Sequence, residues 1–551
     1  MLRPQPIPPI PADTARVARA AFPKGQIYIR LADELGTLFI DATFAALFPT
    51  HGQPALAPWR LALVTILQFA EGLSDRQATD AVRGRIDWKY LLRLDLDHAG
   101  FDASVLVEFR ARLVEGKAER LLFDTILGWC RERQLVKVRG RQRTDSTQVL
   151  AAVRVLNRVE LVGETLRHAL DSLAVAAPDW LAAHSQADWP ERYVRRLDND
   201  RLPTGQAARQ ALAEQIGADG LRLLRLAYAP EAPAWLREVP AVEALRRIWV
   251  QQYAITDGNL RWRTGEDELP PPATFISSPH DQDMHFARKR EATWIGYKVH
   301  RTETCDDGLP PLITHVETTS AATVDGEATP RIHAALKERG LLPCIHVVDT
   351  GFLDADLLVA SRREYDVDLL GPTRLDYHWQ AREQTGFAVA DSHIDWDKRE
   401  AVCPAGRTSL SWTPAVDKGT NAVIKITFSG RDCGPCPCRE QCTRSLKRSP
   451  RRTLTVRTGA AYHALQDARA RARTPAYAAA YAHRAGIEGT LSRGVRRCGL
   501  RQARYLGIAK TRHQHFLIAA SLNMIRIGEW LLERPRARTR VPAFARLMAA
   551  A

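Results

Sequence analysis

Helical spacing of hydrophobic positions dominates residues 53–133. The segment RLALVTILQFAEG places apolar side chains three and four positions apart, and GLSDRQATDAVRGR opens a second helix with Ser74 as N-cap and Gln77 three residues later. Asp102 begins further helical sequence that continues to residue 130. The pattern predicts an all-helical region.

A short turn that contains glycine joins the first two of these helices. Such a pair is typical of a helix-turn-helix unit that binds DNA, with Arg76, Arg83 and Arg85 facing phosphate. Ordinary packing of two helices explains the same pattern. Both interpretations stay open at this point.

The pattern changes to period two at residue 135, where LVKVRGRQRT predicts a strand that ends at Asp145. Helical sequence interrupted by prolines returns over 149–254. The elements predicted after it are strands at 294–300 and 312–318, a helix at 327–339, a strand at 344–348, a helix at 353–363 and a strand at 367–370. With the helical insert set aside, this is a ribonuclease-H-like α/β order, a mixed five-stranded sheet in which antiparallel strands precede parallel strands joined through helices.

Residues 372–456 lack long periodicity. Helical sequence resumes at Thr474 and Pro475, which suit an N-cap and a first helical position, and one helix is expected to include AYAAAYAHRAGIEGTL before a last helix at 508–533. The expected division is a leader, a helical domain, the first core strand, a helical insert with linker, the rest of the core, a Cys-rich insert, a C-terminal helical segment and a basic tail. Their ranges are 1–52, 53–133, 134–148, 149–290, 291–371, 372–456, 457–535 and 536–551.

Composition narrows the class of protein. Of 551 residues, 45% are hydrophobic and 26% are charged, which is ordinary for a globular chain and excludes a disordered or membrane-spanning one. The N-terminus lacks the continuous apolar region of a secretory signal, and the longest apolar stretches, 38–48 and 516–522, are too short to cross a bilayer. We therefore expect a cytoplasmic protein with no membrane partner.

The net charge of +15 comes mostly from arginine. Guanidinium groups bind phosphate oxygens in pairs, and a positive excess concentrates DNA or RNA near the surface. The same charge also serves solubility. A polyanion is one natural partner of such a chain.

Five of the nine cysteines crowd into 40 residues. Their spacing is C-x2-C-x-C-x3-C, preceded by a cysteine in CPAG, and thiolates so spaced suit tetrahedral Zn2+. We expect Cys438 to be the spare one, and an iron–sulfur cluster is the alternative. The ligands expected for zinc are Cys403, Cys433, Cys436 and Cys442. A zinc site of this kind would staple a small insert and support the basic segment 444–457 beside it.

Three carboxylates stand where the predicted sheet would gather them. Asp145 ends the first strand, Asp349 follows the fourth, and Glu488 lies on the late helix. Carboxylate oxygens suit Mg2+ or Mn2+, and two ions about 3.5–4 Å apart activate the attacking oxygen and stabilise the leaving oxygen of a phosphodiester. Any one aspartate after a strand is also explained as a turn-former or helix cap.

The late helix carries a polar stripe. Tyr477, Tyr481, Arg484 and Glu488 are spaced by 4, 3 and 4 residues, so they share one helix face. The stripe places a phenol and a guanidinium beside the acidic residue, where they would contact DNA. A half-buried face with an Arg484–Glu488 ion pair is the competing explanation.

The chain resembles a bacterial insertion-sequence DDE transposase, specifically the cysteine-bearing group named IS eleven-eighty-two. The resemblance covers most of the length. It is carried by LLRLDLDHAGFDASVLVEFRARL, TDST, WIGYKVHRTET, VVDTGFLDADLL, CPAG, CGPCPCREQCT and RAGIEGTLSRGVRRCGLRQARYLG.

Wider relatives carry a Tyr, Arg, Glu, Lys signature spaced Y-x2-R-x3-E-x6-K. Tyr481, Arg484 and Glu488 match it, whereas the Lys position falls on Val495. Arg493 or Arg496 is the candidate replacement, and both join Tyr481 and Arg484 as expected DNA-binding residues.

The resemblance implies a nucleoid-associated enzyme that binds the terminal inverted repeats of its element, cuts there, and joins the 3′ ends to target DNA. Asp145, Asp349 and Glu488 would hold two Mg2+ or Mn2+ ions, and the protein would act as a homodimer or larger assembly on DNA. Lys298 and His300 lie near the expected site or face an edge. A zinc-containing DNA-binding protein without catalysis and a ribonuclease-H-like nuclease are the alternatives.

Overall fold

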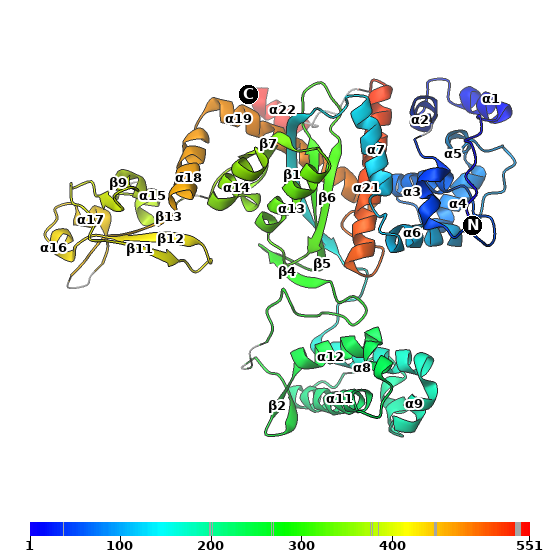
Figure 1. The fold of residues 1–551 in the computed structure, drawn as a ribbon, viewed down its shortest axis with the longest axis horizontal. Coiled ribbons are helices and arrows are strands. Elements are labelled where there is room, and N and C mark those ends of the chain that lie inside the picture. The colour runs from blue at the N-terminus through cyan, green and yellow to red at the C-terminus, as the bar shows by residue number, and fades with distance from the viewer. Residues whose placement is uncertain are drawn as a thin grey trace.

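The computed structural model describes residues 1–550 except 37, 198, 199, 201, 266, 268, 375, 377, 384, 446–448 and 535–541. Its hydrophobic residues form three main cores. One core joins the N-terminal helices to the central sheet, and each of two insertions has a core of its own. Figure 1 shows the helical insertion below the sheet and the Cys-rich insertion at the left end.

The central sheet is mixed. Its order is β4-β5-β1-β7-β8, and β6 also pairs with β5. β5 runs antiparallel to β1, β4 and β6, whereas β1, β7 and β8 are parallel. The strands are β1 (Arg139–Leu150), β4 (His285–Lys289), β5 (Ala292–Thr304), β6 (Ile313–Ser320), β7 (Pro343–Val347) and β8 (Asp368–Leu370).

The sequence predicted five of these strands, an antiparallel trio followed by parallel strands, and missed β4. It also ended the first strand too early, because β1 continues through Asp145 and stays paired with β5 as far as Leu150. Polar side chains along 142–148 break the apolar alternation, so the pattern concealed the true length. Asp145 therefore lies inside a strand instead of at its end.

Helices cover both faces of the sheet. The crossover helices are α13 (Asp325–Glu338) and α14 (Ala355–Tyr365), with the short η4 (Thr350–Phe352) after β7. On the other side α21 (Ile508–Leu531) contacts β6, α3, α7 and α2, so one helix joins the sheet to the N-terminal helices. Within the described ranges, no helix has the length and apolar character needed to cross a membrane.

The N-terminal helices share the core of the sheet. They are α1 (Ala12–Ala21), α2 (Ile27–Leu35), η1 (Asp41–Leu47), α3 (Pro58–Glu71), α4 (Asp75–Gly84), α5 (Ile86–Leu92), α6 (Ser104–Glu115) and α7 (Leu121–Glu132). The capping box of Ser74 and Gln77 is present. The segment expected to be a leader, 1–52, is instead folded into this unit, since Leu31 and Phe44 are fully buried. Its prolines had hidden two short amphipathic helices.

The helical insertion leaves the sheet after β1. It contains α8 (Arg158–Ala176), α9 (Pro178–His184), α10 (Trp189–Tyr193), α11 (Gln206–Ala227), η3 (Ala234–Glu238), α12 (Pro240–Gln252), β2 (Tyr253–Thr256) and β3 (Asn259–Trp262). The β2–β3 hairpin begins at the end of the predicted helical stretch, 149–254, and lies mostly in the segment that was expected to be a linker. Tyr253 and Trp262 pair across it and join the core of the insertion.

The Cys-rich insertion consists of short elements around a three-stranded sheet, β11-β12-β13. They are α15 (Trp379–Glu383), η5 (Val389–Asp391), β9 (His393–Asp395), β10 (Glu400–Val402), β11 (Ser411–Val416), β12 (Ala422–Thr427), α16 (Gly430–Cys433), α17 (Arg439–Cys442) and β13 (Thr453–Arg457). Part of the basic segment, 446–448, lies outside the described residues.

The C-terminal part contains α18 (Gly459–Arg471), α19 (Pro475–Ala482), η6 (His483–Ala485), α20 (Gly486–Cys498), α21 and α22 (Ala543–Ala550). Thr474 caps α19 as predicted. The single helix expected here is broken by the 3-10 turn η6, so the stripe from Tyr477 to Glu488 spans two helices. The expected basic tail, 536–551, includes α22, and its residues 536–541 and 551 lie outside the described part of the chain.

Candidate active site

The register of two parallel strands brings Asp145 and Asp349 together. Arg143 of β1 pairs with Val347 of β7. Asp145 lies two residues further along β1, and Asp349 lies two residues beyond this pair, just after the end of β7, so the two acids lie side by side. Asp349 also caps η4, where its Oδ1 accepts a 2.8 Å hydrogen bond from the Gly351 amide.

Arg484 binds all three predicted carboxylates at once. Its Nη2 lies 2.9 Å from Asp145 Oδ2 and 3.9 Å from Asp349 Oδ2, and its Nη1 lies 3.2 Å from Glu488 Oε1. Arg484 lies in η6 and Glu488 lies four residues later in the first turn of α20, so the two side chains are neighbours. The sequence had proposed only the Arg484–Glu488 pair as an alternative to DNA contact.

The electrostatics of the cluster follow from partial burial. Burial raises the pKa of the Asp145 carboxyl above its usual value, although the Arg484 guanidinium opposes this shift. Burial lowers the pKa of Arg484, but Asp145, Tyr481 and Asp349 together raise it by more. The net shift of the Arg484 pKa is therefore upward. Arg484 is therefore held in its charged form among the acids.

A cavity of about 340 Å³ opens beside the cluster. Asp145 and Glu488 line it together with two basic side chains, Arg496 and Arg501. Arg493 instead forms a 3.0 Å ion pair with Glu529 of α21. Arg493 and Arg496 are the candidates to replace the lysine of the signature. Arg496 lines this cavity, and so does Val495, which occupies the lysine position.

The two tyrosines of the stripe form a stacked pair on α19. Their ring centroids are 5.6 Å apart with an interplanar angle of 9°. Burial raises the pKa of Tyr481, Arg484 lowers it, and Asp349, Asp145 and Glu488 raise it. Tyr481 is thus within electrostatic reach of the whole carboxylate cluster.

The sequence did not single out Asp325, a further acidic residue beside this site. Its Oδ1 accepts a 3.0 Å hydrogen bond from Ser146 Oγ, and Lys298 Nζ lies 3.3 Å from the same oxygen. A Cβ placed on Gly351 would lie 3.1 Å from both Asp325 Oδ2 and Asp349 Oδ1. No periodic signal marks a lone aspartate at a helix start, which explains why the pattern missed it.

Lys298 and His300 lie inward on β5 instead of facing an open edge. The Lys298 side chain is 11% exposed, and the His300 ring is fully buried with Nδ1 3.7 Å from Asp325 Oδ1. Burial lowers the pKa of His300 to about 4, so the ring is neutral at pH 7.

In the N-terminal helices, the arginines expected to face phosphate are partly engaged by acids. Arg83 pairs with Asp80, and Arg85 pairs with Glu71 and Asp87. An ion pair leaves these guanidinium groups less available to DNA than the sequence pattern had suggested.

All five clustered cysteines line one small cavity in the Cys-rich insertion. Burial raises the pKa of the Cys442 thiol, Arg452 lowers it, and Cys403, Cys436 and Cys433 raise it. These four thiols are the set that the sequence assigned to zinc. Across the described residues, no group of three or more His, Cys, Asp or Glu side chains is arranged to hold a metal ion.

Two family models match parts of the chain. Residues 402–528 match a model described as a transposase DDE domain, and residues 16–112 match one described as a transposase domain (DUF772). Both matches support an insertion-sequence transposase. This class implies DNA as the partner, a divalent metal, typically Mg2+, as the cofactor, and metal-dependent DNA cleavage as the activity. No curated protein and no solved structure matches the chain.

The first match includes Glu488 but neither Asp145 nor Asp349. The grouping of the three acids therefore rests on the ion pairs of Arg484 and on the register of β1 with β7.

Proposed function

We propose that the protein is a transposase of the IS eleven-eighty-two group that cuts DNA at the ends of its element and joins the 3′ ends to target DNA. The observation that carries the proposal is the convergence of Asp145, Asp349 and Glu488 on the single guanidinium of Arg484. The β6-β5-β1-β7-β8 order of the sheet supports a ribonuclease-H-like core. Assembly as a homodimer or larger complex on DNA is part of the proposal.

The donor set fits a hard divalent cation, because carboxylate oxygens are the ligands that Mg2+ and Mn2+ prefer. Asp145, Asp349 and Glu488 would hold it, and when bound it would supply charge stabilisation for phosphoryl transfer. Arg484 then has to release the carboxylates, which frees its guanidinium to bind the scissile phosphate. Arg496 and Tyr481 would hold DNA beside it.

One site serves both steps under this proposal. Water attacks the phosphodiester at the element end in the first step, and the freed 3′-hydroxyl attacks target DNA in the second. The two attacking groups are oxygens and both reactions are phosphoryl transfers, so the same carboxylates and the same guanidinium are used twice. No covalent protein intermediate is required.

Conservative amide variants test the catalytic assignment. Asp145→Asn, Asp349→Asn and Glu488→Gln should each abolish Mg2+-dependent cleavage of a labelled terminal-repeat duplex while repeat binding stays nearly intact, because arginines and not carboxylates bind phosphate. Glu338→Gln, at an exposed carboxylate near the end of α13, is the matched control. Wild-type-like cleavage by any amide variant removes that residue from the set. A wild-type protein that binds repeats without cutting favours a transposase-derived DNA-binding protein.

We also propose that Cys403, Cys433, Cys436 and Cys442 bind a structural Zn2+. Two observations support this. The thiols of Cys403, Cys433 and Cys436 lie close enough to raise the pKa of the Cys442 thiol, and the insertion has a small hydrophobic core. Purified protein should contain about one zinc, and Cys433→Ser with Cys436→Ser should release it and unfold the insertion. Cys344→Ser, at an exposed cysteine, should keep the metal. Protein without zinc, or with iron and visible absorbance, contradicts the assignment.

A further inference from the structure

Helix α20 lies on charged residues of the sheet instead of on a purely apolar surface. Gly486, Thr490 and Gly494 are four residues apart, so they lie on one helix face. Beneath these small residues lie the side chains of Arg143, Glu303 and Arg301 in turn. The small residues allow the helix to approach the guanidinium groups closely.

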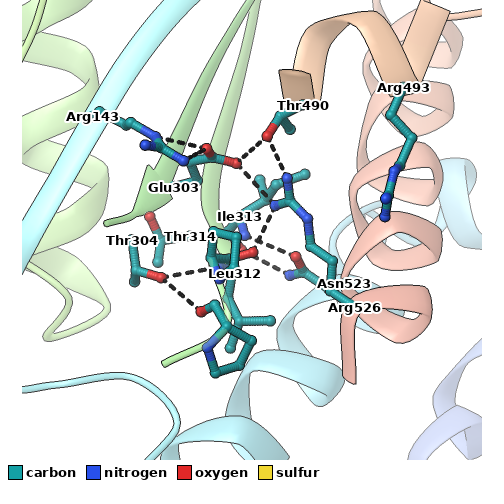
Figure 2. Close-up of polar contacts among 12 residues, drawn as sticks. Arg143, Glu303, Thr304, Leu312, Ile313, Thr314, Thr490, Arg493, Asn523 and Arg526 are labelled. Carbon is teal, nitrogen blue, oxygen red and sulfur yellow. Dashed lines mark hydrogen bonds and ion pairs between the residues drawn. The ribbon is translucent and has the colours of Figure 1, made fainter. Parts of the chain in front are cut away.

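Glu303 of β5 is the centre of this buried network, which Figure 2 shows. It is fully buried and faces Arg143 across the β1–β5 pair, from which it accepts bonds of 2.8 Å from Nε and 2.6 Å from Nη2. Its other oxygen accepts a 2.7 Å bond from Thr490 Oγ1 and a 2.9 Å bond from Arg526 Nη1. One carboxylate thereby connects β1, β5, α20 and α21.

Arg143 extends from this network to the backbone that carries the site. Its Nη1 donates a hydrogen bond to the carbonyl oxygen of His483, the residue before Arg484. A Cβ added to Gly486 would lie only 2.2 Å from the same Nη1 and 2.5 Å from Cζ, so the guanidinium touches the start of α20. Glu303 neutralises the guanidinium from the other side, and its own pKa is lowered because Arg526 and Arg143 outweigh the effect of burial.

We propose that Arg143 is a positioning residue that fixes the distance of Arg484 and Glu488 from Asp145. It lies two residues before Asp145 on β1, and it contacts the turn on both sides of Arg484. A single rigid side chain therefore spans from the strand of one acid to the helix of another. The inference rests on the proposed function, since it assigns these three residues to one reaction.

The structure gives a physical reason for this role to need arginine. The guanidinium fork binds Glu303 with two nitrogens while a third nitrogen reaches His483, which the single ammonium of lysine cannot reproduce. A displacement of about 1 Å of a catalytic group lowers a rate by about 100-fold, so a small shift of α20 is enough to reduce cleavage.

Two glycines on the same helix provide a matched test. Both glycines lie in α20, but only at Gly486 does the new methyl group meet Arg143; at Gly489 no atom of the described residues lies within 4 Å. Gly486→Ala should reduce Mg2+-dependent cleavage at least about tenfold and weaken Mn2+ binding by the DNA-free protein, measured by calorimetry. Gly489→Ala should match wild type in both, and repeat affinity should be unchanged in both variants.

Arg143→Met completes a double-mutant cycle. Glu303 keeps Arg526 and Thr490 as partners in this variant, so its charge remains compensated. Arg143→Met alone should lower cleavage and Mn2+ affinity, and adding Gly486→Ala should cost little more, because the group that the methyl displaces is gone. Additive effects, or Gly486→Ala behaving like Gly489→Ala, overturn the proposal. Wild-type protein that neither cleaves nor binds Mn2+ instead refutes the proposed function.

Discussion

Replacing Arg484 by glutamine should expose the conflict among the three carboxylates that it now joins. Glutamine keeps most of the side-chain length and removes the charge. The variant retains Asp145 and Asp349 on neighbouring strands, where like charges repel. We expect a loss of stability, a gain in metal affinity and a loss of cleavage, all from this one substitution.

The size of the stability loss follows from the exposure of each partner. Breaking a fully buried ion pair costs about 3–5 kcal/mol, whereas an exposed pair contributes about 0–1 kcal/mol. The Arg484 and Asp145 side chains are 17% and 12% exposed, so their 2.9 Å contact lies between these limits. The contact with Asp349 is long at 3.9 Å, and Glu488 is 68% exposed, so both add little. A loss of about 2 kcal/mol is therefore expected for Arg484→Gln.

Mg2+ should restore this loss. In wild type the ion competes with Arg484 for the carboxylates, whereas in the variant it binds them without that cost. A ligand at about one hundred times its Kd stabilises by about 2.7 kcal/mol, so Mg2+ should raise the melting temperature of the variant more than that of wild type. Repeat affinity should change by about one counterion in its salt dependence, because one phosphate contact is lost among many.

Thermal unfolding with and without Mg2+, run beside a cleavage assay, decides the case. Arg246→Gln is the control, because Arg246 forms an exposed ion pair with Glu243 in the helical insertion. It should lose less than about 1 kcal/mol and show the wild-type response to Mg2+. If Mg2+ stabilises Arg484→Gln no more than wild type, or if the variant cleaves normally, Arg484 does not compete with the metal for these carboxylates.

Two further predictions concern single side chains near the sheet. Gly351→Ala should reduce cleavage because its methyl group would lie 3.1 Å from carboxylate oxygens of both Asp325 and Asp349, whereas Gly326→Ala, with its nearest neighbour at 3.5 Å, should cleave normally; equal rates would contradict the crowding. Burial lowers the pKa of His513 to about 4. Between about pH 6.5 and 4 the unfolded chain therefore binds a proton at this residue and the folded chain does not, so stability falls as the pH drops through this range. His513→Asn should remove about 1.4 kcal/mol per pH unit from that slope in urea unfolding, and an unchanged slope would show that this ring does not contribute.

The strands β5 and β6 could be predicted from their β-branched and aromatic residues, although both strands also bury polar side chains such as Glu303 and His315. The meeting of Asp145 and Asp349 was also predictable, since residues at corresponding positions of neighbouring parallel strands lie side by side. The full length of β1 was not predictable, because its polar residues 142–148 make hydrogen bonds and ion pairs inside the protein, such as Arg143 with Glu303. Hydrophobic patterns treat such residues as exposed.

The contacts of α20 and α21 could not be predicted from the sequence for a related reason. Residues 516–522 are hydrophobic on every side, which signals burial but does not identify the partners, and in the structure they join the N-terminal helices to β6. The break at η6 left no proline or glycine signal before Gly486, so the late helix was expected to be continuous. In the structure Arg484 contacts Asp145 and Asp349 from this turn, and Glu488 contacts Arg484 from α20.

The positions of the two insertions follow from the directions of the strands. β1, β7 and β8 are parallel, so their carboxyl ends lie at the same edge of the sheet. The helical insertion follows the carboxyl end of β1, the Cys-rich insertion follows that of β8, and Asp349 follows that of β7. Each insertion has its own hydrophobic core, whereas the helices of residues 16–112 share the core of the sheet. We therefore expect changes in the insertions to alter which DNA reaches the site, and changes in the shared core to alter the chemistry itself.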